Sequence, residues 1–292
     1  MQCTRRKWLV NAAALPALAA KPAYRPSIGV ALYVWTQQFA REKKTLSQGI
    51  EEAFPAVSRA GYRRTELMSQ FWAPDLRDKT RALLKQSKLE AVSMYNGGPM
   101  HTPEGAEQTI ARTLDLAEVA RAAGARTVAF NPDPKRGRKT DEELAIQAKY
   151  LNQLGARLKE RKMGFFIHQH APEMREDARE WRHVLRHTDG NLVKFCLDVD
   201  WVKRGGQDPM TLLREAGARL GSLHLRSARN GVWMEEFGDG DVDYREVAAY
   251  LKQIGFRGDL LVELAYEKDT QITRSLEEDL KRSREYAEKI FL

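Results

Sequence analysis

The sequence predicts a single-domain (β/α)8 TIM barrel, and three observations support that fold class. Apolar, strand-like runs alternate with helical runs through eight successive pairs in this 292-residue chain. Such alternation is typical of parallel α/β folds. A doubly wound open sheet shares the alternation, but eight pairs favour a closed barrel. The sequence has no GxGxxG motif after the first strand and no Walker-type loop, so the usual reason for an open nucleotide-binding sheet is missing.

Residues 1–20 have the features of an export signal, and we expect the barrel to occupy residues 24–292. Arg5 and Arg6 stand in a charged segment before an apolar, alanine-rich run over residues 10–20, which is the order found in secretory signals. The paired arginines resemble the twin-arginine signal of bacteria, which predicts a periplasmic protein exported after folding. The alternative is an N-terminal helix with a basic end, but a fold-forming helix is seldom so uniformly apolar.

The composition excludes two classes of partner. The formal net charge is +8, and three of these charges belong to Arg5, Arg6 and Lys7, so the mild excess on the remaining chain does not predict nucleic-acid binding. No segment after the signal approaches the roughly 18 consecutive apolar residues of a membrane span, so we expect no membrane insertion.

Removal of the signal would leave Cys196 without Cys3, so no intramolecular disulfide is expected.

The first half of the chain contains four strand and helix pairs. Apolar runs predict strands at residues 27–32, 62–68, 89–95 and 125–130, and helical periodicity predicts helices at 46–60, 75–86, 103–123 and 141–161. Thr102 before Pro103 has the residue types that begin a helix. Thr140 with Glu143 forms a capping-box pattern ahead of the fourth helix.

The second half repeats the pattern four more times. Strands are predicted at residues 165–167, 193–197, 219–225 and 260–264, with helices from Glu173, Asp208 and Asp243 and a charged final helix at 276–290. Glycines at or near helix ends, including Gly61, Gly124 and Gly255, supply the turns that lead back into strands. These units complete the count of eight.

Four of the later strands run into a residue type that binds metals or protons. These residues are His168, Asp198, His224 and Glu263, separated by 30, 26 and 39 residues. The C-terminal strand ends of a TIM barrel build the active site, so we expect the four side chains to meet. Each alone could be a hydrogen-bonded core residue, but four separately buried ionisable groups would each cost several kcal/mol without a partner.

The four residues predict a site for one divalent metal ion. Two imidazoles and two carboxylates form a mixed nitrogen and oxygen set that suits Mn²⁺ first, with Zn²⁺, Co²⁺, Fe²⁺ or Mg²⁺ as alternatives. Calcium prefers oxygen ligands alone and is a poor match.

Other polar and aromatic residues near the strand ends are candidates for substrate binding: Trp35, Glu66, His101, Asn131, Trp201 and Arg226. The two tryptophans would either stack on a sugar ring or fill the core. Glu66 would be either an interior salt-bridge partner or an acceptor for a substrate hydroxyl. If the strands continued, His170 and Asp200 would face the same interior as the residues two positions before them. The basic stretch over residues 135–139 is expected to be a solvated loop more than a phosphate clamp.

Several motifs resemble the xylose isomerase-like barrels of the sugar phosphate isomerase/epimerase family. They are FIHQHAPE at 166–173, LDVDW at 197–201, HLR at 224–226 and GDGDVD at 238–243. The resemblance implies a single divalent metal held by Glu, Asp, His and Glu at the ends of strands five to eight, with both glutamates able to exchange a proton with a sugar carbon. Asp198, His224 and Glu263 match the last three positions.

Two positions depart from the family pattern. His168 stands where the epimerases have Glu, although a His-x-His-x-x-Glu version of strand five resembles a known subset of the family. Ser227 stands where the family often has Asp. The metal site is therefore expected to persist, whereas the two-glutamate epimerase mechanism is put in question.

We predict a metal-dependent isomerase or epimerase that acts through an enediolate on a small carbohydrate, namely a sugar, polyol or keto-sugar. A divalent ion that chelates a carbonyl and the neighbouring hydroxyl acidifies the shared C–H bond. Glu263 is the candidate base, His170 or His101 would return the proton, and His168 completes the catalytic set. Without a second glutamate, isomerase or lyase chemistry is favoured over two-base epimerisation.

Three alternatives stay open. A lyase would use the same intermediate for β-elimination from a keto-glycoside. A non-catalytic periplasmic sugar-binding barrel would explain the altered strand five. An apurinic-site endonuclease of the same superfamily would need a multi-metal cluster, which six histidines do not favour when His183 and His187 lie in a predicted helix. The particular sugar and the oligomeric state are not predicted.

Overall fold

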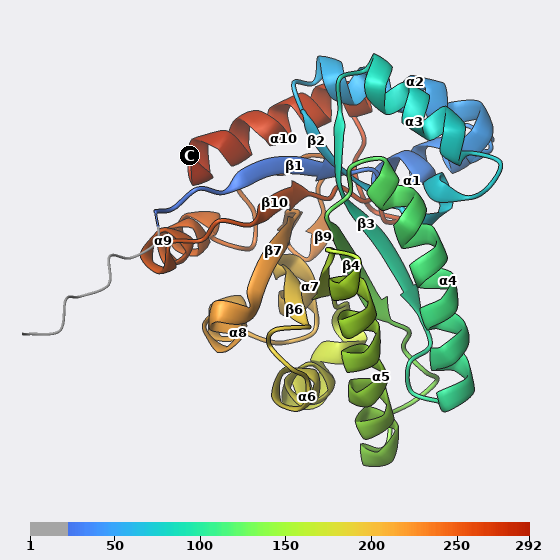
Figure 1. Ribbon diagram of the computed structural model, residues 1–292. Coiled ribbons are helices and arrows are strands. Elements are labelled where there is room, and N and C mark those ends of the chain that lie inside the picture. The colour runs from blue at the N-terminus through green and yellow to red at the C-terminus, as the bar shows by residue number, and fades with distance from the viewer. Residues whose placement is uncertain (1–22) are drawn as a thin grey trace, which may run out of the picture.

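A computed structural model describes residues 23–292 of the protein. The predicted export signal at residues 1–20 lies outside the described residues. Eight parallel strands form a closed barrel in the order β1-β10-β7-β6-β5-β4-β3-β2, and the helices surround it (Figure 1). The predicted (β/α)8 barrel is therefore confirmed.

The barrel strands lie close to the predicted positions. They are β1 (Ser27–Ala31), β2 (Arg64–Met68), β3 (Glu90–Gly98), β4 (Thr127–Pro132), β5 (Gly164–Ile167), β6 (Lys194–Asp198), β7 (Leu220–Leu225) and β10 (Asp259–Val262). The cylinder closes where β1 pairs in parallel with β10, with Ser27 opposite Asp259. Closure leaves no free sheet edge in the barrel.

The main helices also match the prediction to within a few residues. They are α2 (Leu46–Arg59), α3 (Arg77–Gln86), α4 (Pro103–Ala122), α5 (Asp141–Glu160), α6 (Ala171–His187), α8 (Pro209–Ala216), α9 (Tyr244–Ile254) and α10 (Leu276–Phe291). The predicted capping box begins α5: Thr140 Oγ1 accepts from the Glu143 amide at 3.2 Å, and the Glu143 carboxylate accepts from the Thr140 amide at 2.7 Å.

Several short elements were not predicted. They are α1 (Tyr33–Arg41), η1 (Ser69–Trp72), α7 (Val199–Arg204), η2 (Gly217–Arg219) and a hairpin of β8 (Ala228–Arg229) and β9 (Val232–Trp233). The shortest of these span less than the window over which periodicity is recognisable. Elements α1, α7 and the hairpin follow β1, β6 and β7 closely, so they shape the end of the barrel where the candidate site lies.

Aromatic side chains fill the layer between barrel and helices. Trp181 of α6 packs on Phe195 of β6 with ring centroids 4.9 Å apart, and Phe54 of α2 lies edge-on to Phe71 at 6.1 Å. Full burial of such a side chain stabilises the fold by about 1.5–3 kcal/mol. Within residues 23–292, no helix combines the length and the apolar character needed to cross a bilayer.

Candidate metal centre

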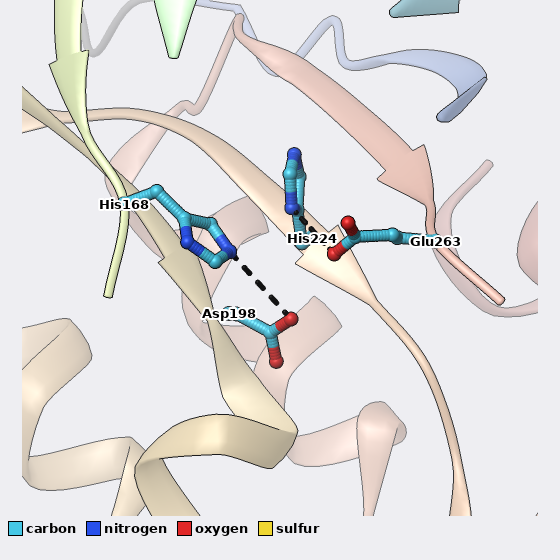
Figure 2. Close-up of side chains that lie close together, drawn as sticks. All are labelled: His168, Asp198, His224 and Glu263. Carbon is cyan, nitrogen blue, oxygen red and sulfur yellow. Dashed lines mark hydrogen bonds and ion pairs between the residues drawn. The ribbon is translucent and has the colours of Figure 1, made fainter. Parts of the chain in front are cut away.

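The structure brings the four predicted ligands together. His168 follows β5, Asp198 ends β6, His224 lies in β7 and Glu263 follows β10. One ligand atom from each residue lies within 4.8 Å of the others, and all four residues are buried. Figure 2 shows the side chains pointing toward one another. Adjacent strands of one barrel therefore supply a compact group of two nitrogens and two oxygens.

The geometry within the group fits a metal ligand set. His224 Nδ1 lies 2.8 Å from Glu263 Oε2, and His168 Nε2 lies 3.8 Å from Asp198 Oδ2. His168 Nε2 is buried and has no hydrogen-bond partner among the described residues. A buried imidazole nitrogen normally has a partner, so this atom fits a ligand to an ion better than a core hydrogen bond.

Arg226 is also part of the centre. Its Nε donates to Asp198 Oδ2 at 3.0 Å, and its Nη2 donates to Glu263 Oε2. The guanidinium is buried and stacks over the Trp233 ring, 4.7 Å from its centroid. Arg226 thus balances the negative charge of both carboxylates and would share their oxygens with a bound ion.

The two carboxylates respond differently to this environment. Burial by itself would raise the pKa of Glu263, but the charges of Arg226 and His224 outweigh it and hold that pKa well below its usual range. Burial raises the pKa of Asp198, and Arg226 opposes that rise. Glu263 is therefore a stable carboxylate, held in place through its Oε2 atom.

The two imidazoles also differ. Burial lowers the pKa of His168 well below its ordinary value, so the ring is neutral and keeps a lone pair for a metal. Burial would lower the pKa of His224 too, but the neighbouring Cys196, Glu263 and Glu66 raise it well above the ordinary value. A metal ion at Nδ1 of His224 would therefore displace a proton.

His170 and Trp201 extend the centre. The His170 ring lies 4.9 Å from His168 and 5.1 Å from Trp201, centroid to centroid. Burial, with a smaller contribution from His168, lowers the pKa of His170 to about 3, so its imidazole is neutral. The His170 amide donates to Glu173 Oε2 at 2.8 Å at the start of α6, and burial raises the pKa of Glu173 to about 7.

Asp200 does not face the metal ligands, which differs from the expectation. Strand β6 ends at Asp198, and Asp200 lies in α7, so the period of two no longer applies. The Asp200 carboxylate instead accepts from Trp233 Nε1 at 2.7 Å and from Arg204 Nε at 3.0 Å. The Trp233 amide also donates to Glu267 at 2.6 Å. These bonds hold the β8–β9 hairpin against α7.

Three predicted substrate residues make local contacts. Trp35 is buried in α1 against Phe39, with ring centroids 5.7 Å apart, because a helix starts at the strand end and directs this side chain into the helical layer. His101 lies near Lys139, and burial lowers its pKa. Asn131 Nδ2 donates to the carbonyl of the next residue at 3.0 Å. No measured contact joins these residues to the four ligands.

The structure adds residues that the sequence did not single out. Tyr95 ends a predicted strand, and its hydroxyl lies 3.4 Å from His168 Nδ1. Trp233 stands in a hairpin too short to be recognised from sequence. Lys139 contradicts the expected solvated loop, because it is buried and pairs with Glu180 Oε1 at 2.5 Å. Only the position of Tyr95 at a strand end offered a signal in advance.

Comparison with known proteins establishes the family. Residues 54–290 match the family described as the xylose isomerase-like TIM barrel, and the chain belongs to it. The inosose dehydratase of Clostridium perfringens is 29% identical over 167 residues, which cover 51% of this chain and 56% of that protein. The inosose dehydratase of Lacticaseibacillus casei is 22% identical over 273 residues, covering 81% and 88%. The chain thus spans about half the length of the first of these relatives.

Solved structures agree on the fold. The sugar phosphate isomerase/epimerase of Parabacteroides distasonis has a TM-score of 0.70 at 18% identity, covering 94% of this chain and 96% of that one. The D-allulose 3-epimerase of a Methylomonas species, solved with D-allulose, has a TM-score of 0.72 at 16% identity, covering 92% and 99%. Identities this low show the fold alone.

Proposed function

We propose that this protein is a metal-dependent dehydratase that eliminates water beside the carbonyl of a keto-polyol or keto-sugar. The observation that carries this proposal is the buried group of His168, Asp198, His224 and Glu263 with a second neutral imidazole, His170, next to it. The similarity to inosose dehydratases supports a lyase over the isomerase or epimerase that the sequence alone favoured. We further propose that the mature chain, residues 24–292, acts in the periplasm after twin-arginine export.

The four ligands would hold one divalent ion. His168 Nε2 and His224 Nδ1 would supply nitrogen, and Asp198 and Glu263 would supply oxygen. When bound, such an ion polarises the substrate carbonyl as a Lewis acid and makes the adjacent C–H bond more acidic. The mixed donor set suits Mn²⁺, Co²⁺, Fe²⁺ or Zn²⁺ better than Mg²⁺, and Mn²⁺ is our first choice.

The proton transfer is assigned to His170. Elimination removes a proton from the carbon beside the carbonyl, breaks the C–O bond at the next carbon and forms a carbon–carbon double bond. The departing hydroxyl takes up the proton and leaves as water. The neutral imidazole of His170 can accept the proton from carbon and deliver it to the departing hydroxyl, so one side chain performs both proton transfers.

With His170 as the base, Glu263 no longer has the role of base that the sequence predicted. The Glu263 carboxylate is bound at Oε2 by both Arg226 and His224, so that oxygen is already engaged and is not free to take a proton from the substrate. Its proposed tasks are to hold the ion and to orient Arg226. Trp201, 5.1 Å from His170 between ring centroids, would offer its face to the carbon skeleton of the substrate.

The experiment follows product formation in D₂O. Protein folded in the cytoplasm is loaded with Mn²⁺ and incubated with inososes and open-chain keto-sugars, and mass spectrometry follows loss of water and deuterium uptake. We expect loss of one water with the parent. His170→Gln should keep its metal and lose turnover, whereas Glu263→Gln should lose both.

Each other outcome argues against the proposal in a different way. An isomer or epimer formed without loss of water would support an isomerase or epimerase instead of a dehydratase. Sugar binding without any product would support a non-catalytic binding barrel. A His170→Gln variant with parental turnover would return the role of base to Glu263.

A further inference from the structure

Glu66 is a buried carboxylate on the far side of His224 from Glu263. It lies in β2 and is fully buried, as is His224. Glu66 Oε1 is 2.9 Å from His224 Nε2, while Glu263 Oε2 is 2.8 Å from His224 Nδ1. The imidazole is therefore held between two carboxylates, and each of its nitrogens faces a different one.

We propose that Glu66 is a positioning residue that accepts the Nε2–H of His224 and so keeps the lone pair of Nδ1 directed at the metal ligands. This inference rests on the metal centre of the proposed function. A neutral imidazole has one N–H and one lone pair, so the partner of one nitrogen decides what the other can bind. Carboxylate partners of metal-bound histidines act in this way.

The surroundings of Glu66 support a role directed at His224. Neither of its oxygens has a hydrogen-bond donor within residues 23–292, and the contact with Nε2 is at ion-pair distance but off the N–H axis. A buried carboxylate without a partner is costly, and His224 is the partner in reach.

His168, the second imidazole of the centre, has a similar arrangement in which the roles of its two ring nitrogens are exchanged. His168 directs Nε2 at Asp198, and the Tyr95 hydroxyl lies 3.4 Å from its Nδ1. A phenol oxygen can accept from Nδ1–H, which leaves Nε2 with the lone pair. Each imidazole thus has a separate partner behind it, and the longer Tyr95 contact predicts a weaker effect than that of Glu66.

Burial argues against the other expectation for Glu66, which was an acceptor for a substrate hydroxyl. Its side chain has no exposed surface, and it contacts the nitrogen of His224 that points away from Glu263. A purely structural carboxylate would change the free energy of unfolding without changing metal affinity. Metal affinity therefore separates a positioning role from a structural one.

The test compares Glu66→Gln, Glu66→Met and Tyr95→Phe with the parent. Asp279→Asn is the control, since Asp279 is another fully buried carboxylate, which accepts from Arg274 Nε at 2.8 Å in α10. Chelator competition measures the affinity for Zn²⁺ and Mn²⁺, and thermal unfolding measures the stability of metal-free protein. We expect Glu66→Met to lose about 10- to 100-fold in affinity, Glu66→Gln and Tyr95→Phe to lose less, and Asp279→Asn to match the parent.

A spectroscopic readout is independent of turnover. In Zn²⁺-loaded parent labelled with ¹⁵N-histidine, we expect one metal-bound Nδ1, from His224, and one metal-bound Nε2, from His168, whereas two metal-bound Nε2 signals would mean that His224 binds through its other nitrogen. If Glu66→Met does not fold, Glu66→Gln and the parental spectrum carry the test.

The outcomes separate this inference from the proposed reaction. Parental affinity in Glu66→Met, or His224 bound through Nε2, overturns the positioning role. A parent that binds no metal overturns both the positioning role and the proposed function. A parent that binds metal, depends on Glu66 and removes no water overturns the dehydratase alone.

Discussion

Arg226 contacts two of the four candidate ligands, and its charge governs how strongly they attract another cation. The guanidinium lies about 3 Å from Asp198 and also bonds Glu263, so it opposes a divalent ion by direct Coulomb repulsion. We predict that Arg226→Met raises Mn²⁺ affinity several-fold while lowering turnover, because the substrate loses an orienting cation. Isothermal titration and the D₂O assay measure the two effects.

The control for Arg226 is Arg204→Met. Arg204 also stacks on Trp233, 4.3 Å from its centroid, but pairs with Asp200 and Glu267 instead of the ligands. Its loss should leave metal affinity unchanged. Weaker metal binding in Arg226→Met would mean that the arginine organises the carboxylates more than it repels the ion.

Glu173 gives a residue-scale prediction about pH. Burial raises its pKa to about 7 in the folded state, against about 4.3 for the unfolded chain. Between these values the folded state binds more protons, so this group lowers the free energy of unfolding as pH rises from about 4.3 through 7. We predict that Glu173→Gln is the more stable protein at pH 8, by up to about 3 kcal/mol, with the difference shrinking toward pH 5.

Urea unfolding of parent and Glu173→Gln at pH 5 and pH 8 measures this difference. The glutamine carbonyl can still accept from the His170 amide, so the start of α6 is preserved. A gap between the two proteins that does not change with pH would show that Glu173 titrates near its ordinary pKa.

At the scale of elements, α1 and α2 pack closely through a glycine. A Cβ atom on Gly49 of α2 would lie 2.3 Å from the ring of Phe39 in α1. We predict that Gly49→Ala lowers the free energy of unfolding by about 1–3 kcal/mol, as overpacking usually does. Ser47→Ala, at an exposed position of the same helix, should stay within about 0.5 kcal/mol of the parent. Equal effects of both changes in urea unfolding would contradict this account.

Helix α6 contains a left-handed turn directly after the His-x-His-x-x-Glu motif. Glu176, Asp177 and Ala178 have φ values of 52°, 58° and 52°, a conformation that costs a non-glycine residue roughly 1–2 kcal/mol. We predict that Glu176→Gly stabilises the protein by up to about 1 kcal/mol, since its ion pair with Arg138 is exposed and contributes little.

The same change in a right-handed helix should have the opposite sign. Gln153 is exposed in α5, and Gln153→Gly should destabilise by about 1 kcal/mol. Thermal unfolding of the two variants compares them directly. Destabilisation of similar size at both positions would show that the turn at Glu176 does not strain the chain.

The proposed metal ion should stabilise the whole molecule when it binds. A ligand that binds only the folded state at 100 times its dissociation constant adds about 2.7 kcal/mol to the free energy of unfolding. We predict that Mn²⁺ raises the melting temperature of chelator-treated parent, that Ca²⁺ raises it less, and that His224→Ala abolishes both shifts. Calorimetry measures the effect, and an unchanged parental melting temperature would argue against a metal centre.

Much of the fold was predictable because barrel strands and their helices are local patterns. The strand ending at Asp198 and the helix capped by Thr140 needed only neighbouring residues. Helix α1 and the β8–β9 hairpin were missed because they are short and are held by distant partners, as in the bond from Trp233 to Asp200. Trp35 was assigned to substrate for the same reason, since without α1 it stood at a strand end.

The sequence by itself determined the eightfold alternation and placed His168, Asp198, His224 and Glu263 at the ends of successive strands. Only the tertiary structure decided that Arg226 holds two of the ligands and that Glu66 faces His224. The physical reason is distance along the chain: β2 and β7 lie far apart in sequence, and closure of the barrel brings their side chains within hydrogen-bonding reach. A strand pattern predicts which residues point inward, whereas closure decides which of them touch.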